Sequence, residues 1–175
     1  IHGTRFGNDK SAVSVELSGN VLMDSTTACG NIGAHISFVG AHGVVLTAGA
    51  MQKTKDNTWW DSGSYSASSI TSPSQCTNGF SFMAQQKEAA MIGFSSSHVG
   101  YGCDDIQYAW YTASATGRVH VREGCQVPDD ANSQGYPRPL GSLSVMSMRL
   151  NAEGRVEWLI DGNVVYTSVS VPLLP

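Results

Sequence analysis

Carboxylate pairs are the residues of this chain that could do acid–base chemistry on a sugar bond. Hydrolysis of that bond needs two carboxyl groups roughly 5 to 9 Å apart, which on a strand means residues separated by two or four positions. The nearest acidic pairs are Asp104–Asp105, Asp129–Asp130 and the more widely spaced Glu153–Glu157. Neighbouring residues of a strand point to opposite faces, so Asp104 and Asp105 can act together only where the backbone bends.

Other catalytic patterns are missing from the sequence. A G-x-S-x-G motif, which would place a nucleophilic serine on a sharp turn, does not occur. The histidines are scattered, with none set beside a plausible nucleophile: His2, His35, His42, His98 and His120. We therefore predict that the protein is not an enzyme, and a glycoside hydrolase is the least favoured alternative.

Metal binding is suggested at one place. Asp104 and Asp105 follow a stretch rich in Gly and Tyr, residues 100–103, and such a loop could supply about two or three of the oxygen ligands that calcium needs. A strand-entry loop with solvated acidic side chains accounts for the same residues, and we favour that interpretation. We therefore predict no cofactor and keep calcium at this loop as the alternative.

Short runs of alternating apolar and polar residues, separated by turn residues, dominate the rest of the sequence. Their apolar positions lie in residues 13–17, 36–38, 44–46, 80–82, 91–94, 106–110, 119–121, 146–150, 156–160 and 164–166. Only residues 83–91 have a helical composition, and we expect a loop or a single helical turn there. Many short strands without long helices predict an all-β, antiparallel two-sheet sandwich. Its expected core aromatic residues are Tyr108, Trp110, Trp158 and Tyr166.

The chain has four cysteines, Cys29, Cys76, Cys103 and Cys125, in the even number and wide spacing of a disulfide framework. Neither a C-x-x-C pair nor a histidine at zinc-ligand spacing accompanies them, so we predict two disulfides in an oxidising compartment. Cys103 and Cys125 flank an expected hairpin, residues 105–123, and lie nearly opposite each other. When the core-facing residues of the two strands are paired, Cys103 lies opposite position 124 or 126 and not opposite Cys125. A β-bulge of one residue would correct this register. Among three pairings we therefore prefer Cys103–Cys125 with Cys29–Cys76.

Composition narrows the partners and the location. The chain has 175 residues, which suits one domain, and 14% of them are charged, against about 25% in typical soluble domains. With a formal net charge of −4, nothing favours nucleic acid or an anionic membrane. No apolar run approaches the ~20 residues of a transmembrane helix. The chain begins at Ile1 without a signal-peptide pattern, which fits a mature or trimmed protein, secreted or in an organelle lumen.

From Val44 onward, several motifs follow one another in an order typical of one family. They are Trp60–Gly63 (W-D-S-G) with Tyr65–Ser68 (Y-S-A-S), Met91–Ser95 (M-I-G-F-S), Asp105–Ala109 (D-I-Q-Y-A), Val119–Gly124 (V-H-V-R-E-G), and Gly154–Trp158 with Asp161–Tyr166. Together they resemble the concanavalin A-like lectin/glucanase superfold, the jelly-roll group of LamG- and SPRY-like domains in bacterial and protist surface proteins. Gln107 departs from the family pattern, where Asp is usual.

The resemblance implies a fold and a domain plan. A single concanavalin A-like jelly-roll domain is expected over residues 1–175. Its family-like core spans 44–171, and residues 1–43 supply extra N-terminal strands, one or two of them at a sheet edge. Because this superfold includes lectins, hydrolases and structural modules alike, it implies a function only in outline.

Sugar binding needs aromatic rings that stack on sugar faces, beside hydrogen-bonding side chains. The aromatic candidates are Trp59, Trp60, Tyr65, Tyr101, Tyr111 and Tyr136. Neighbouring tryptophans of an extended segment face opposite sides, and the resemblance assigns Trp60 to the core, which leaves Trp59 pointing outward. We name Trp59 and Tyr101, with Asp104 and Asp105, as the candidate ligand-binding residues.

Two functions stay open at this point. The first is a non-catalytic recognition module, with lectin-like binding or adhesion through the sandwich. The second is a structural or accessory subunit of a larger assembly in an oxidising compartment. The expected partner is accordingly a glycan or another protein.

Overall fold

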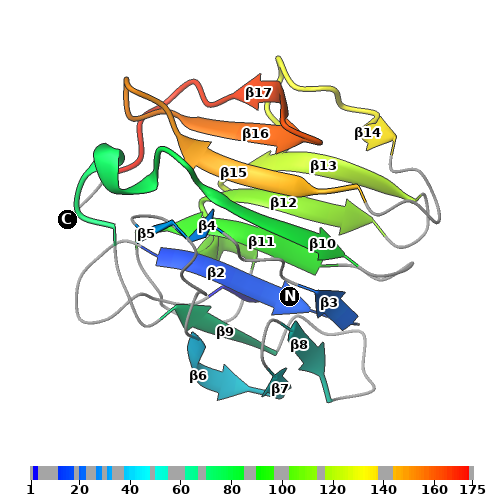
Figure 1. The fold of residues 1–175 in the computed structure, drawn as a ribbon. Coiled ribbons are helices and arrows are strands. Elements are labelled where there is room, and N and C mark those ends of the chain that lie inside the picture. The colour runs from blue at the N-terminus through cyan, green and yellow to red at the C-terminus, as the bar shows by residue number, and fades with distance from the viewer. Residues whose placement is uncertain are drawn as a thin grey trace.

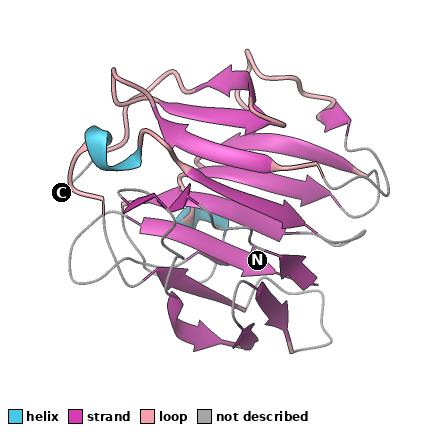
Figure 2. Cartoon of the chain, in the orientation of Figure 1, coloured by secondary structure: helices cyan, strands magenta, loops and turns pink. Residues whose placement is uncertain are grey.

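The segments with alternating apolar residues form strands, and the computed structural model has an all-β fold (Figures 1 and 2). It describes residues 2–3, 12–17, 20–22, 27–28, 31–32, 38–47, 50–54, 62–66, 70–84, 90–96, 103–113, 117–137 and 144–173. Within these ranges the helical elements are two short 3-10 turns, η1 (Pro73–Cys76) and η2 (Cys103–Asp105). No helix in this part of the chain is long and apolar enough to cross a membrane.

Two large sheets contain most of the described strands. The eight-stranded sheet has the order β1 (His2–Gly3), β9 (Gly63–Ser66), β2 (Ala12–Leu17), β11 (Ala90–Ser95), β12 (Tyr108–Ala113), β13 (Arg118–Glu123), β14 (Tyr136–Pro137), with β6 (Phe38–His42) also paired to β9. The seven-stranded sheet has the order β17 (Asn163–Thr167), β16 (Val156–Ile160), β15 (Met146–Leu150), β10 (Phe80–Ala84), β3 (Asn20–Leu22), β8 (Ala50–Lys53), β7 (Val44–Thr47). A small pair, β4 (Thr27–Ala28) and β5 (Asn31–Ile32), completes the described sheets. Apart from the parallel pair β1–β9, the described pairs are antiparallel, as predicted.

The two large sheets meet through tryptophans that alternate with outward residues along their strands. The indole Nε1 of Trp110, on β12, donates to the backbone carbonyl of Ser147 on β15 at 3.0 Å. In the opposite direction, Nε1 of Trp158 on β16 donates to the carbonyl of Ala109 on β12 at 3.0 Å. Figure 1 shows β15 and β16 lying over β12 and β13 in agreement with these contacts. The expected core aromatic residues are all buried: Tyr108, Trp110, Trp158 and Tyr166.

The N-terminal segment supplies an edge strand, as expected, and also strands inside the sheets: β1 lies at one edge of the eight-stranded sheet, whereas β2 and β3 have partners on both sides. β2 pairs with β11 over its full length and with β9 on its other side. β3 lies between β10 and β8 in the same way. A strand with partners on both sides satisfies both rows of its backbone hydrogen bonds, which an edge position leaves to solvent. Residues 1–43 therefore supply strands to the interior of both large sheets, and are more than an appendage to residues 44–171.

A short 3-10 turn, η1, was not expected from the alternation pattern. The segment starts at Ser72 with Pro73 at its first position, and the side-chain oxygen of Gln75 accepts the backbone N–H of Ser72 at 3.2 Å. This is a capping box, and proline suits the first helical position because no N–H is needed there. The loop predicted at 83–91 is shorter in the structure, because residues 83–84 belong to β10 and residues 90–91 to β11; residues 85–89 lie outside the described residues.

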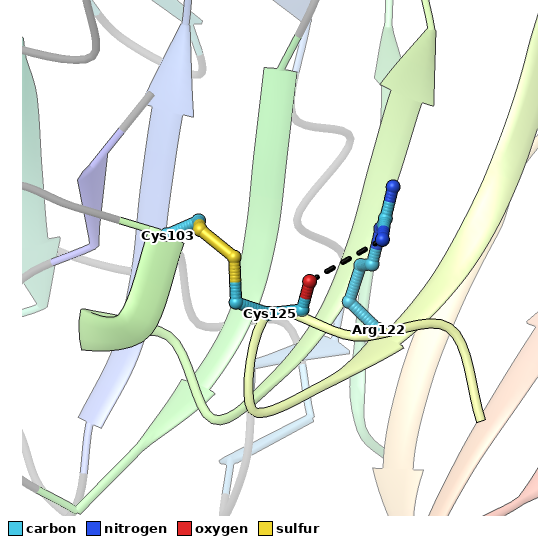
Figure 3. Close-up of a disulfide and its surroundings, with 3 residues drawn as sticks. All are labelled: Cys103, Arg122 and Cys125. Carbon is cyan, nitrogen blue, oxygen red and sulfur yellow. Dashed lines mark hydrogen bonds between the residues drawn. A yellow bond between two sulfur atoms is a disulfide. The ribbon is translucent and has the colours of Figure 1, made fainter.

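The predicted Cys103–Cys125 disulfide is present and closes the open end of the β12–β13 hairpin, with the two Cα atoms 5.3 Å apart (Figure 3). The parity mismatch is resolved without the expected bulge. β12 starts only at Tyr108, and Cys103 belongs to η2, outside the ladder. On the other strand, Gly124 and Cys125 have φ of 53° and 68° and form a tight turn in which Glu123 and Gln126 exchange backbone hydrogen bonds. Positive φ at both central residues is the mark of a two-residue hairpin turn.

The second predicted disulfide is described at one of its two cysteines. Cys76 is completely buried and is disulfide-bonded. Cys29 lies outside the described residues, so the Cys29–Cys76 bond stays a prediction.

Candidate functional site

The predicted ligand-binding residues are described only in part. Trp59 and Tyr101 lie outside the described residues, and for Asp104 only the backbone, in η2, is described. Asp105 is buried, with 5% of its surface exposed, which corrects the expectation of a solvated acid. It follows the disulfide-bonded Cys103 in η2 and precedes the fully buried Ile106, so the chain turns inward here. These four residues therefore stay a prediction as a set.

Calcium at this loop also stays a prediction. Among the side chains that the structure describes, no three His, Cys, Asp or Glu residues gather closely enough to hold a metal ion. The carboxyl group of Asp104, on which the calcium alternative depends, is not among them.

Two of the other aromatic candidates pack against the protein itself. The ring of Tyr136 meets Trp110 edge-on, 6.0 Å between centroids, and its hydroxyl donates to the carbonyl of Val165 at 3.1 Å. The ring of Tyr65 lies over Gly40, where a Cβ would overlap it. Both rings are used in packing between strands, so neither is a free platform for a sugar.

Polar and aromatic side chains gather instead on the outer face of β12 and β13. Trp110 and Val121 point into the core, so their strand neighbours Tyr111 and His120 must point outward. The register places Tyr111 directly opposite His120. The same alternation puts Arg118 and Arg122, on either side of His120 along β13, on that outer face. We call Tyr111, Arg118, His120 and Arg122 the outer-face cluster.

The Tyr111 ring contacts two other side chains of the cluster. The centroids of the Tyr111 and His120 rings are 6.0 Å apart, and the guanidinium carbon of Arg122 lies 5.2 Å from the Tyr111 centroid. A guanidinium at that distance over a ring is a cation–π contact worth about 0.5 to 1 kcal/mol at a partly exposed site. Arg122 is also anchored by donating to the carbonyl of Cys125 at 3.3 Å (Figure 3). The disulfide-closed turn therefore helps to orient this side of the cluster.

The other side of the cluster is bounded by the segment that follows β13, residues 124–135. Arg118 donates to the carbonyl of Gly135 at 2.8 Å. Gly135 has φ of 74°, and a Cβ there would come within 2.6 Å of the His120 ring. Glycine at 135 therefore serves both the backbone conformation and the close approach to the imidazole.

His120 is kept neutral by its surroundings. Burial is the main reason that its pKa lies below the ordinary value, and the positive charges of Arg122 and then Arg118 lower the pKa further. Its Nδ1 atom is buried and has no hydrogen-bond partner among the described residues. The cluster thus presents an aromatic ring, a neutral imidazole and two guanidinium groups, which can stack on a ring and hydrogen-bond to hydroxyl or carboxylate oxygens.

A second polar group lies on the opposite, inner side of β13. Glu123 faces the core side of the sandwich edge together with Asp130 and Tyr166, whose hydroxyl donates to Asp130 Oδ1 at 3.0 Å. The sequence interpretation did not bring Glu123 and Tyr166 together, and Asp130 itself is exposed in a turn. A signal did exist: Glu123 continues the core-facing parity of Val119 and Val121, and a carboxylate in such a position needs partners.

Comparisons with protein-family models, with curated proteins and with solved structures gave no match.

Proposed function

We propose that this chain is a non-catalytic recognition module, a concanavalin A-like jelly-roll sandwich that binds a carbohydrate through the outer-face cluster. The observation that carries the proposal is the half-buried Tyr111 ring, oriented by His120 at 6.0 Å and Arg122 at 5.2 Å. Protein sites for sugars combine an aromatic ring for the apolar face of the sugar with fixed polar groups for its hydroxyls. Trp59 and Tyr101 remain further candidates for the same ligand.

The inner polar group gives little support for catalysis. Glu123 and Asp130 are carboxyl groups near one another, as hydrolysis of a sugar bond requires. However, Tyr166 lies between them and is buried, with only 7% of its surface exposed. One of the two carboxyl groups, Asp130, already accepts the hydroxyl of Tyr166, and this packed side chain leaves no place for a sugar between the two acids. Recognition without catalysis is therefore the better proposal.

The test is a glycan array that includes neutral and acidic oligosaccharides, probed with three forms of the protein. We expect the wild type to bind a subset of glycans, Tyr111→Phe to retain binding, and Tyr111→Ala to lose at least about fivefold in affinity, because stacking on a ring is worth on the order of 1 kcal/mol or more. Tyr111 is only partly buried, so both variants should fold. Absence of binding to every glycan by the folded wild type would rule the proposal out.

A structural or accessory role is the second candidate, and one observation favours it. Large aliphatic side chains on β17 and the segment after it are exposed: Val164 (45%), Val169 (63%), Val171 (50%) and Leu173 (81%). These four residues lie within residues 164–173 of the chain, and exposed apolar residues that form one patch mark protein contacts. Loss of co-purifying protein on changing Val169 and Val171 to Ser, together with a blank glycan array, would establish this candidate.

The proposed compartment is oxidising, either outside the cell or in an organelle lumen. The Cys103–Cys125 disulfide supports it, because such bonds form and persist mainly in oxidising surroundings.

A further inference from the structure

Two carboxyl groups and one hydroxyl meet where β13 and β17 reach the edge of the sandwich. Glu123 is the last residue of β13 and is paired in register with Tyr108. Tyr166, on β17, donates its hydroxyl to Asp130 Oδ1 at 3.0 Å, and Glu123 lies close enough to Tyr166 for each group to affect the pKa of the other. Asp130 lies in segment 124–135, so this contact joins that segment to the opposite sheet.

When Glu123 and Asp130 are both ionised, these two acids and Tyr166 have too few hydrogen-bond donors among them. An ionised carboxylate only accepts hydrogen bonds, and a tyrosine hydroxyl has a single proton to donate. Once Tyr166 donates to Asp130, it has none for Glu123. The Glu123 carboxyl group accepts the backbone N–H of Val169, but its Oε1 atom is buried without a hydrogen-bond partner among the described residues. Such an unmet buried acceptor is costly.

We propose that Glu123, Tyr166 and Asp130 form a proton-operated latch. A proton held by Glu123 allows it to donate to the Tyr166 oxygen while Tyr166 donates to Asp130, and this chain holds segment 124–135 against β17. When Glu123 releases its proton to solvent at higher pH, two negative acceptors compete for one donor and the segment loosens.

The groups that face Glu123 are consistent with a segment that loosens as the pH rises. They come from three sides: Tyr108 on β12, Tyr166 on β17, and Asp130 in segment 124–135, besides the Val169 N–H. Burial is the largest effect and raises the pKa of Glu123; the polar groups of Tyr166 and Val169 nearby lower it, and the negative charge of Asp130 raises it. Arg122, the neighbouring cation, is on the outer face and donates to Cys125.

The sign of the pH dependence follows from the raised pKa. A carboxyl group whose pKa is higher in the folded state contributes stability below its ordinary value of 4.5, and that contribution is lost as the pH rises through the raised value. His120 has the opposite sign, because its lowered pKa costs stability as the pH falls. A loosening at rising pH therefore cannot come from His120.

The latch has a consequence for the outer-face cluster, and this consequence rests on the proposed function. The far end of segment 124–135 is Gly135, whose carbonyl accepts Arg118 and whose Cα packs on His120. Loosening the segment would remove these contacts of Gly135 with the outer-face cluster. We therefore expect sugar affinity to be highest in mildly acidic solution and to fall as the pH rises.

Hydrogen exchange tests the latch without any ligand. The readout is the protection of amides in 124–135, such as Ala131 N–H, bonded to Pro128 O, and Gly135 N–H, bonded to Asn132 O. Rates are divided by the intrinsic exchange rate at each pH. In the wild type we expect protection to fall about fivefold between pH 4 and pH 8, the equivalent of one lost hydrogen bond.

Variants separate the latch from general charge effects. Glu123→Gln supplies an N–H donor at every pH, so its protection should stay high and flat, and Asp130→Asn, which removes one negative acceptor, should also flatten the profile. Glu153→Gln removes the same charge at an exposed turn and should keep the wild-type slope. A flat wild-type profile, or an unchanged slope in folded Glu123→Gln, would overturn the latch. Neither result bears on whether the protein binds sugar, which the array decides.

Discussion

At the scale of single residues, Gly135 is the position where backbone conformation and site geometry coincide. We expect Gly135→Ala to lower the free energy of unfolding by about 2 kcal/mol, from the positive φ and from contact with His120. Gly162→Ala is the matched control, because Gly162 has a similar φ of 80° and a Cβ added there would meet nothing within 4 Å.

Urea denaturation of both variants measures the difference. The control should lose only about 1 kcal/mol, the cost of the conformation alone. Equal losses in the two variants would mean that the approach of Gly135 to His120 carries no energetic weight, and would remove the reason to place segment 124–135 at the outer-face cluster.

The burial of single residues could be predicted where the alternation of inward and outward side chains along a strand decided it. Alternation placed Tyr108, Trp110, Trp158 and Tyr166 in the core, because each run faces the core at every second position. The same rule would have flagged Glu123, had it been applied to charged residues. The partners of Glu123 could not be inferred, since Asp130 and Tyr166 come from a loop and from the other sheet.

At the scale of elements, the β12–β13 hairpin carries the cluster on one face and the latch on the other. The Cys103–Cys125 bond closes this hairpin across a separation of 22 residues. Replacing both cysteines by Ala should lower the free energy of unfolding by ~3 kcal/mol, because the unfolded chain regains the freedom of that loop.

Denaturation of the double variant beside the oxidised wild type checks this value. The single variant Cys103→Ala should lose about as much as the double one, since either change removes the bond. A loss below about 1 kcal/mol would show that the turn at 124–125 is held by its hydrogen bonds alone.

Hairpin pairing could be predicted from the sequence, but the details at the strand ends could not. The expected bulge and the observed arrangement both bring Cys103 near Cys125. The choice between them depends on the positive φ of Gly124 and Cys125 and on η2, which are set by local contacts outside the alternating pattern.

At the scale of the whole molecule, the all-β class was predictable and the strand order was not. Period-2 alternation identifies strands but does not specify their neighbours, so it could not show which N-terminal strand lies at an edge, as β1 does, and which lie inside the sheets, as β2 and β3 do. Their neighbours are set by long-range packing between segments far apart in the chain. The placement of Tyr111 beside His120 and Arg122 follows from the register of one hairpin, whereas the approach of Gly135 depends on the path of the following segment.

The central claim is that the outer face of β12–β13 binds sugar. The most direct test is an NMR titration of ¹⁵N-labelled protein with the oligosaccharide that binds most strongly on the array. We expect the largest shifts at the amides of Tyr111, His120 and Arg122 and at the His120 imidazole, with little change around Val164 and Val169. Shifts confined to the β17 region, with none in the outer-face cluster, would contradict the claim.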